Sequence, residues 1–286
     1  MKQRRFLELD VFADAPGRGN PLGVVVDAGD LDTSTMQAIA AWLNLSETTF
    51  VLPASQRSAD YRLRIFTPRQ ELPFAGHPSV GTAHAVLELG LVAPRGGRLV
   101  QECGAGLLPI EVAGEGSQRR IHVRAPRGVQ RSADAATILQ SLRSRSLGRL
   151  PPVVIDNGPR WWCIELADEV VVRTLAPDLQ AMALSTVETG TVGVAVYARC
   201  TGQPYALVVR AFVPADGIPE DPVTGSANAA ICTWLHANDA LPAGRFLSSQ
   251  GREVGRDGIV ECAVDAQGEA WIGGQTQTVV NGVMNW

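Results

Sequence analysis

Hydrophobic and polar positions follow nearly the same order in the two halves of the chain. Tyr61 to Phe66 alternates between apolar and polar side chains, which is the period of a half-buried strand. Tyr205 to Val209 is apolar and partly β-branched, which also favours a strand. A proline soon follows each strand and ends it, because proline has no N–H for a sheet ladder. An alanine-rich apolar run comes next in each half, at Thr82–Leu89 and at Ser226–His236. Each run predicts a helix wrapped by its own sheet.

The segments that join strand to helix also match. His77–Ala85 and Asp221–Ala229 both fit the pattern [His/Asp]-Pro-x-x-Gly-[Ser/Thr]-Ala-[His/Asn]-Ala without a gap, 144 positions apart. This offset is close to half of the 286 residues, so the repeat predicts two α/β (α+β) domains related by pseudo-symmetry. In this register, Asp221 occupies the position of His77.

The remaining pattern fits this two-domain frame. We expect an N-terminal domain at 1–125, a C-terminal domain at 126–272, and a last strand at 273–286 that returns to the N-terminal domain. A charged helix is expected within Arg127–Leu150, before the junction at Pro151-Pro152. A helix through Met36–Leu43 is expected to be capped by Asp32 or Thr33. Further strands are predicted at Leu7–Phe12, Leu22–Val26, Thr48–Leu52, Val153–Ile155, Trp162–Leu166, Val192–Tyr197 and Gly258–Val264.

Charge and composition exclude several partners. The formal net charge is -4, which gives the chain no attraction to nucleic acid or to an anionic membrane surface. No stretch approaches the roughly 18 apolar residues that a membrane span needs. The basic start, Lys2 to Arg5, is followed by the acidic residues Glu8 and Asp10, which a signal peptide would not carry. We therefore expect a cytoplasmic protein.

The sequence also lacks the marks of a metal or cofactor site. The five cysteines are scattered and form no Cys-x-x-Cys pair, so neither a disulfide framework nor a zinc site is predicted. His77 and His84 are seven residues apart, with no carboxylate at a known ligand spacing. No phosphate-binding glycine motif of the nucleotide enzymes is present. We therefore expect neither a metal nor a cofactor.

A set of short motifs, taken in order, resembles the PhzF-like family named for phenazine biosynthesis, within the diaminopimelate-epimerase-like superfamily. Each motif is weak alone, but together they run in order from about residue 9 to residue 274. They are Gly19–Leu22, Asn44–Phe50, Phe66–Pro68, Glu71–Pro78, Glu220–Ala227, Gln250–Arg256 and Trp271–Gly274.

The resemblance implies two domains, each a curled sheet or barrel around a central helix, with the active site between them and a homodimeric assembly. It further implies a cofactor-independent isomerase that uses a glutamate with supporting His, Asp and Ser residues. In related racemases a pair of cysteines does this work. Neither copy of the repeat contains a cysteine, so a two-thiol mechanism is not expected here.

Three residues are candidates for catalysis. Glu47 begins a strand in an otherwise uncharged segment, where a carboxylate is harder to ionise, as a general acid/base requires. The resemblance makes it the proton-carrying glutamate; without it, a strand-edge glutamate that faces water is the simpler interpretation. His77 could hold a substrate oxygen or relay a proton, or be a loop histidine satisfied by backbone. Asp221 could pair with it, or only cap a helix.

Gly76, Gly225 and Ser226 are candidates for substrate binding. Glycines near helix starts leave backbone N–H groups open, and the helix dipole favours negative charge there. Two such helix starts would suit a small carboxylate. The alternative is that the glycines only permit tight turns or close packing.

These residues predict that Glu47 removes a C–H proton and returns it to another carbon of a conjugated carboxylate, such as trans-2,3-dihydro-3-hydroxyanthranilate. An amino-acid or hydroxy-acid racemase or epimerase of the same superfamily is the nearest alternative, and a non-catalytic metabolite-binding protein is the alternative of another class. The substrate is left open. So are the roles of Trp161 and Trp162, either of which could stack on a planar substrate or pack in the core, and of Arg160, a carboxylate clamp or a surface ion pair.

Overall fold

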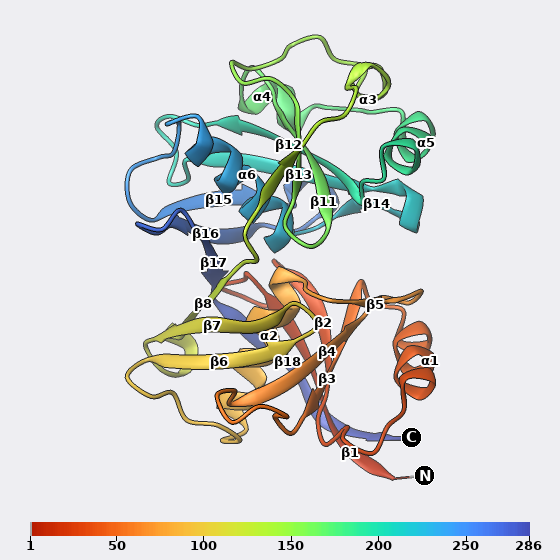
Figure 1. The fold of residues 1–286 in the computed structure, drawn as a ribbon, viewed down its shortest axis with the longest axis vertical. Coiled ribbons are helices and arrows are strands. Elements are labelled where there is room, and N and C mark those ends of the chain that lie inside the picture. The colour runs from red at the N-terminus through yellow and green to blue at the C-terminus, as the bar shows by residue number, and fades with distance from the viewer. Residues whose placement is uncertain (1) are drawn as a thin grey trace. The chain divides into compact units, whose positions relative to one another are not determined.

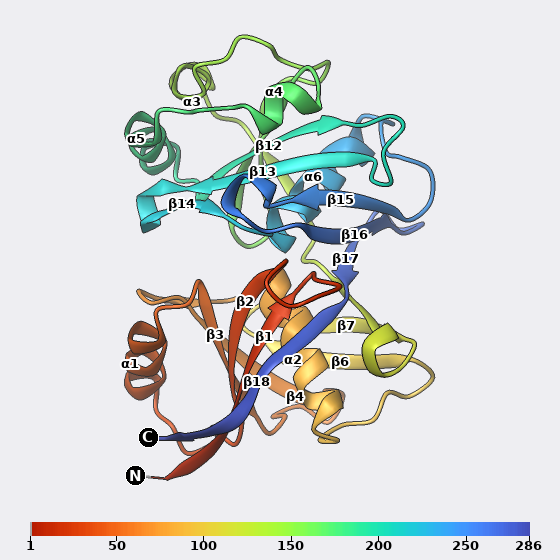
Figure 2. The ribbon, with the colours of Figure 1, turned by 180° about the vertical axis from the view of Figure 1, so that it is seen from behind.

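A computed structural model describes residues 2–286, which form two compact units (Figures 1 and 2). Unit 1 holds the chain up to Arg124 together with Gly273–Trp286, and unit 2 holds Ala125–Ile272. The expected limits of the folding domains, 1–125, 126–272 and 273–286, stay a prediction. No helix within residues 2–286 is both long enough and apolar enough to cross a membrane.

Unit 1 is a mixed sheet in the order β18-β1-β2-β3-β4-β6-β7-β8. Within this order β2–β3 and β4–β6 are parallel pairs and the others are antiparallel, while the short β5 pairs with β4. The bounds are β1 Gln3–Val11, β2 Asn20–Val25, α1 Thr33–Leu43, β3 Glu47–Leu52, β4 Tyr61–Phe66, β5 Glu71–Leu72, α2 Gly76–Glu88, β6 Arg98–Cys103, β7 Gly106–Ala113, a 3-10 turn Gly116–Gln118, β8 Arg120–Arg124 and β18 Thr276–Asn285.

Helix α2 is the centre of unit 1. It contacts β1, β2, β3, β4, β8 and β18, and every residue from Gly76 to Val86 is buried. The sheet therefore curls around it, as Figure 2 shows. Helix α1 packs on β3 and β4 from the other face, where Phe50 and Phe66 join its core. Thr49, the neighbour of Phe50, points the opposite way and accepts a hydrogen bond from Thr82 of α2.

Unit 2 repeats this arrangement in the order β9-β10-β11-β12-β13-β15-β16, with β11–β12 and β13–β15 as the parallel pairs. Helix α6 contacts β10, β11, β12 and β16, and α4 and α5 pack on the sheet over a separate hydrophobic cluster that α3 completes. The bounds are β9 Val129–Arg131, α3 Ala136–Ser141, β10 Val153–Asp156, β11 Arg160–Glu165, α4 Glu169–Arg173, α5 Leu179–Thr189, β12 Gly193–Arg199, β13 Leu207–Val213, a 3-10 turn Pro214–Asp216, β14 Ile218–Asp221, α6 Gly225–Ala237, β15 Phe246–Gln250, a 3-10 turn Arg252–Val254 and β16 Gly258–Val264. The strand β17, Ala270–Gly274, begins in unit 2 and ends in the last segment of unit 1.

The two central helices begin at equivalent glycines. Gly76 and Gly225 are 149 positions apart, each is the first residue of its helix, and both helices have 13 residues. The preceding segments match in this register, Glu71-Leu72-Pro73 against Glu220-Asp221-Pro222. Both predicted helices form, but α2 begins six residues earlier than expected, because Pro78 is tolerated in a first helical turn.

The predicted register of 144 is therefore wrong. The structural counterpart of His77 is Ser226, since both are the second residue of their helix. Asp221 is not the counterpart of His77; it matches Leu72, and it ends a strand four residues before its helix begins. Aligning His77-Pro78 with Asp221-Pro222 matches the two sequence motifs, but it does not superimpose the starts of the two helices.

Most other expectations hold. Asp32 caps α1 by accepting a hydrogen bond from the Thr35 N–H at 2.7 Å. The strands predicted outside the repeat all form. The charged helix expected within 127–150 is wrong, because the helix there, Ala136–Ser141, is short and carries no charged side chain. The α/β fold class, with a curled sheet around a central helix in each half, is confirmed.

Candidate active site

Glu47 is placed by the parallel pair that β2 and β3 form. It is the first residue of β3 and lies opposite Leu22 of β2. Its side chain is only 17% exposed, so it does not point freely into water. The simpler interpretation, a strand-edge glutamate that faces solvent, does not describe this residue.

His77 lies beside Glu47. It is buried in the first turn of α2, and its Nε2 is 3.4 Å from Glu47 Oε2. Each of these two atoms is buried, and their separation and alignment are those of a close contact rather than a formed hydrogen bond. The structure therefore brings two of the three predicted catalytic residues together within unit 1.

Burial keeps the imidazole neutral. Removal from water lowers the pKa of His77 to about 3, and a hydrogen bond to the Pro21 backbone, whose only polar group is its carbonyl, opposes the shift. At neutral pH the ring therefore carries one N–H and one lone pair. A neutral ring next to a carboxyl group can donate to it or accept from it, according to which group holds the proton.

The Asn20-Pro21 dipeptide orients this ring. Asn20 is fully buried, and its Nδ2 lies 3.5 Å from His77 Nδ1. The Ser46 hydroxyl donates to Asn20 Oδ1 at 3.2 Å, so both ends of the Asn20 amide have a side-chain partner. Asn20, Ser46, Glu47 and His77 thus form one connected group at the start of α2.

A buried carboxylate fixes the turn that presents Asn20. Asp10 accepts the backbone N–H groups of Arg18 at 2.9 Å and of Gly19 at 3.1 Å. Gly19 is obligatory for packing, because a Cβ there would lie 2.1 Å from the carbonyl oxygen of Val11. This explains why the motif before Asn20 requires glycine.

In unit 2, Asp221 is held by Thr224 and Gln250. The Thr224 hydroxyl donates to Asp221 Oδ2 at 2.5 Å. Gln250 Nε2 donates to the Asp221 carbonyl at 3.0 Å and to Thr224 Oγ1 at 2.9 Å. Its Oε1 accepts from the Thr224 N–H at 3.0 Å and from Asn228 at 3.1 Å. Four hydrogen bonds therefore lock one buried amide onto the start of α6.

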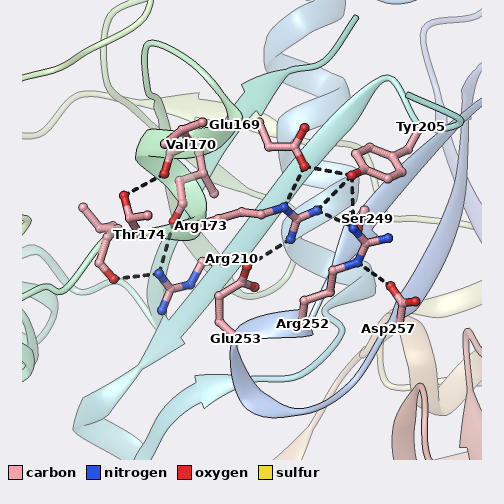
Figure 3. A network of polar contacts seen from close by, with 12 residues as sticks. Glu169, Val170, Arg173, Thr174, Tyr205, Arg210, Ser249, Arg252, Glu253 and Asp257 are labelled. Carbon is pink, nitrogen blue, oxygen red and sulfur yellow. Dashed lines mark hydrogen bonds and ion pairs between the residues drawn. The ribbon is translucent and has the colours of Figure 1, made fainter. Parts of the chain in front are cut away.

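The strand end that carries Gln250 is fixed in turn by a charged network, shown in Figure 3. Arg173 donates to Glu169 at 2.6 Å, to Glu253 at 2.9 Å and to the Ser249 hydroxyl at 3.1 Å. The Tyr205 hydroxyl donates to Glu169 at 2.8 Å. Because every charge in the network has a partner, we assign it a structural role.

Both central helices start without a side-chain cap. Ala75 cannot provide one, and the Thr224 side chain makes no capping bond. The first N–H groups of each helix, including those of Gly76, Gly225 and Ser226, have no partner one turn back. The helix dipole adds partial positive charge there, so each start is suited to an anion.

Ser226 has defined partners in unit 2. Its Oγ accepts the indole N–H of Trp161 at 3.1 Å, and its carbonyl accepts from Asn157 Nδ2 at 2.9 Å. Trp162 instead donates to Thr189 at 3.1 Å within the cluster around α5. Arg160 is half-exposed and pairs with Asp156, so the interpretation as a surface ion pair describes it.

Sequence reasoning missed Asn20, Ser46, Asn157 and Gln250 as individual residues. All but Asn157 stand in motifs already singled out, but a motif does not show which of its side chains reach a helix start. The five cysteines are free, and burial raises the thiol pKa of Cys163. No cluster of three or more His, Cys, Asp or Glu residues suited to a metal occurs among residues 2–286.

Comparison with known proteins identifies the family. The family described as PhzC-PhzF, phenazine biosynthesis-like protein, matches residues 9–282. The chain belongs to this family.

Antisense-enhancing sequence 1 of Schizosaccharomyces pombe is 35% identical over 99% of this chain and 99% of its own length. Trans-2,3-dihydro-3-hydroxyanthranilate isomerase of Pseudomonas aeruginosa is 34% identical over 93% and 92%. The crystal structure of the Bacillus anthracis phenazine biosynthesis protein of the PhzF family matches with a TM-score of 0.85, at 27% identity over 100% of both chains.

Membership of the PhzF family also indicates the class of enzyme. Several relatives that span about nine-tenths of this chain are named isomerases, and the protein is accordingly a PhzF-type isomerase. The match covers both units, so both helix starts lie inside the family's common region.

Proposed function

We propose that this isomerase moves one proton between two carbons of a small conjugated carboxylate, with Glu47 as the proton carrier. The contact between Glu47 and a buried, neutral His77, 3.4 Å apart, carries the proposal. A carboxylate that is mostly shielded from water and adjoins a neutral imidazole has the surroundings of a general acid/base. The enzyme needs no oxidant and no reductant, because the proton removed is the proton returned.

The proposed reaction balances in two steps. Glu47 takes the C–H proton as base, and the electron pair left behind spreads over the conjugated system towards its oxygen. Glu47 then donates the same proton to another carbon, and a double bond moves. His77 is proposed to hydrogen-bond the substrate or Glu47 as the charge shifts, since its ring stays neutral throughout.

The remaining predicted residues are proposed to bind the substrate. Gly76, Gly225 and Ser226 offer N–H and O–H donors to a carboxylate, and Asp221 is the third proposed catalytic group. The relative from Pseudomonas aeruginosa suggests trans-2,3-dihydro-3-hydroxyanthranilate as the first compound to try. Dimerisation and a cytoplasmic location stay predictions.

Proton NMR in D2O tests the proposal. Wild-type protein with trans-2,3-dihydro-3-hydroxyanthranilate is expected to isomerise it, and deuterium enters the product to the extent that the proton on Glu47 exchanges with solvent between the two steps. Glu47→Gln is expected to lower the rate by about 10²- to 10⁴-fold, the usual contribution of a general acid/base. Glu71→Gln, which removes a half-exposed carboxylate paired with Arg64, is the matched control and is expected to react normally.

The outcomes separate the alternatives. Normal turnover by Glu47→Gln contradicts the assignment of the base. Deuterium exchange at a stereocentre of an amino or hydroxy acid, without movement of a double bond, indicates a racemase or epimerase. Saturable binding of a carboxylate with neither exchange nor conversion indicates a binding protein.

A further inference from the structure

Two adjacent tryptophans on β11 face opposite sides of the unit 2 sheet. Trp161 donates its indole N–H to Ser226 of α6, and Trp162 donates to Thr189 of α5. Both hydrogen bonds are 3.1 Å long and both rings are buried. The alternation follows from the strand period of two, which sends neighbouring side chains to opposite faces.

The bond from Trp161 determines what Ser226 can do. A hydroxyl group has one proton to donate and two lone pairs that accept. The indole N–H is a donor only, so it can occupy nothing but a lone pair of Ser226 Oγ. Across residues 2–286, Ser226 Oγ has no second hydrogen-bond partner. Its own O–H therefore remains available to donate to a ligand.

Asn157 holds the same residue from its backbone. Its Nδ2 donates to the Ser226 carbonyl at 2.9 Å, while its Oδ1 is buried without a hydrogen-bond partner within the described chain. Ser226 is 7% exposed and Asn157 is 1% exposed. The Asn157 Oδ1 acceptor and the Ser226 O–H donor are thus both buried and both without a partner at the start of α6. A site meant to stay apolar would carry neither group.

We propose that Trp161 is a positioning residue that turns Ser226 into a dedicated hydrogen-bond donor to the carboxylate of the substrate. The inference rests on the proposed function, because it assumes that the start of α6 binds that carboxylate. Donation from Trp161 also polarises the Ser226 hydroxyl, so its O–H becomes a stronger donor. Trp161 itself does not stack on the substrate; it acts through Ser226.

The neighbouring tryptophan provides a matched control. Trp161→Phe and Trp162→Phe each remove one indole N–H and one 3.1 Å bond to a hydroxyl from a buried ring on the same strand. Their effects on thermal stability are expected to be similar. Only Trp161→Phe changes a group at the start of α6.

Titration with 3-hydroxyanthranilate, a planar carboxylate with no double bond to move, tests the inference by ¹H–¹⁵N NMR. The chain has six tryptophans, and the two variants assign the indole signals of Trp161 and Trp162 by their loss. In wild-type protein the Trp161 indole signal is expected to shift on binding and the Trp162 signal to stay. Trp161→Phe is expected to weaken binding about three- to tenfold, Trp162→Phe less than twofold, and Ser226→Ala about tenfold or more.

Each result has a definite meaning. If Ser226→Ala weakens binding while Trp161→Phe binds as wild type and the Trp161 signal stays, the positioning role is overturned and the proposed carboxylate site stands. If Ser226→Ala binds as wild type, or wild type does not bind the compound, the proposed site fails and the inference fails with it. If Trp161→Phe does not fold, single substitutions of the other five tryptophans assign the remaining indole signal to Trp161, and its shift in unmodified protein decides the matter.

Discussion

The starts of α2 and α6 are the same structure built for different chemistry. Both begin with glycine, neither has a side-chain cap, and in each an asparagine reaches the second helical residue: Asn20 at the start of β2 in unit 1, and Asn157 in the turn between β10 and β11 in unit 2. That residue is His77 in unit 1 and Ser226 in unit 2. Unit 1 thus presents a ring with a titratable nitrogen next to Glu47, and unit 2 presents a hydroxyl fixed by Trp161. The fold supplies two similar helix starts, and single side chains give each its own polar groups.

The hairpins before these two helices also differ between the units, in how deeply an equivalent ion pair is buried. Arg64 and Glu71 form a two-bond ion pair in unit 1, and Arg210 and Glu220 form the equivalent pair in unit 2. Each arginine also lies over a phenylalanine two residues on. The Arg210–Glu220 side chains are each 8% exposed, whereas Glu71 is 39% exposed. The two ion pairs therefore have similar geometry but differ in burial.

The largest expected difference comes from removing one charge of each pair. Glu220→Gln is expected to lower the free energy of unfolding by about 3–5 kcal/mol, because it leaves the buried Arg210 cation without its anion. Glu71→Gln is expected to cost less, about 1 kcal/mol, because Arg64 is 17% exposed, so water still reaches it, and it keeps its hydrogen bond to Thr33. Urea denaturation at pH 7 measures both. Equal losses in the two variants would show that burial does not set the strength of these pairs.

A smaller difference is expected between two buried glutamines. Gln250 makes four hydrogen bonds around Thr224, whereas Gln101 of β6 accepts from Tyr61 of β4 and donates to Ser79 in the first turn of α2. Gln250→Met leaves several buried partners unpaired and is expected to destabilise by about 2–4 kcal/mol, against about 1–2 kcal/mol for Gln101→Met. Thermal unfolding of both variants checks the order. A larger loss for Gln101→Met would contradict the assignment of Gln250 as the main brace.

The sequence predicted both central helices but not which residues of one are equivalent to which residues of the other. Alanine-rich apolar runs after a strand and a proline indicate a central helix whatever the exact start, so α2 and α6 were predictable. The start of α2 was not, because His77-Pro78 resembles the end of a loop and is in fact the first helical turn. Aligning it with Asp221-Pro222 gave an apparent match of nine residues and the wrong partner for His77.

The polar braces could not be predicted for a related reason. Glu47 and His77 are 30 positions apart, and Trp161 and Ser226 are 65 apart, so only the packing of each central helix on its own sheet brings each pair together. Sequence patterns fix which face a residue takes, as for Trp161 and Trp162. They do not fix which atom on that face it meets.

A difference of about 2 kcal/mol is expected from the titration of His77. Burial depresses its pKa to about 3 in the folded protein, whereas the unfolded chain titrates near 6.5. Between these values the unfolded state binds the extra proton, so the free energy of unfolding falls as the pH falls below 6.5. At about 1.4 kcal/mol per pH unit, the loss by pH 5 is about 2 kcal/mol.

Denaturation at pH 6.5 and at pH 5 isolates this contribution. His77→Gln removes the titrating ring, so its stability is expected to fall less than that of wild type over this interval. Ser226→Ala, at the equivalent position of unit 2, removes no titrating group and is expected to follow wild type. If all three proteins lose the same stability, His77 is not held neutral by burial.

The smallest effect tests whether the two helices are packed alike along their length. Gly81 of α2 and Ala230 of α6 are equivalent in the 149 register. A Cβ at Gly81 would lie 2.5 Å from Leu22 Cδ2 and 2.8 Å from Val11 Cγ2, contacts that require both side chains to move.

Overpacking of this kind costs about 1–3 kcal/mol, and the better helix propensity of alanine returns about 1 kcal/mol. Gly81→Ala is therefore expected to destabilise by about 1 kcal/mol, and the reverse change, Ala230→Gly, by a similar amount through lost propensity and a lost buried methyl. If both substitutions lower the free energy of unfolding, each helix is fitted to its own sheet. If Gly81→Ala raises it, unit 1 has room for the methyl group and packing does not require this glycine.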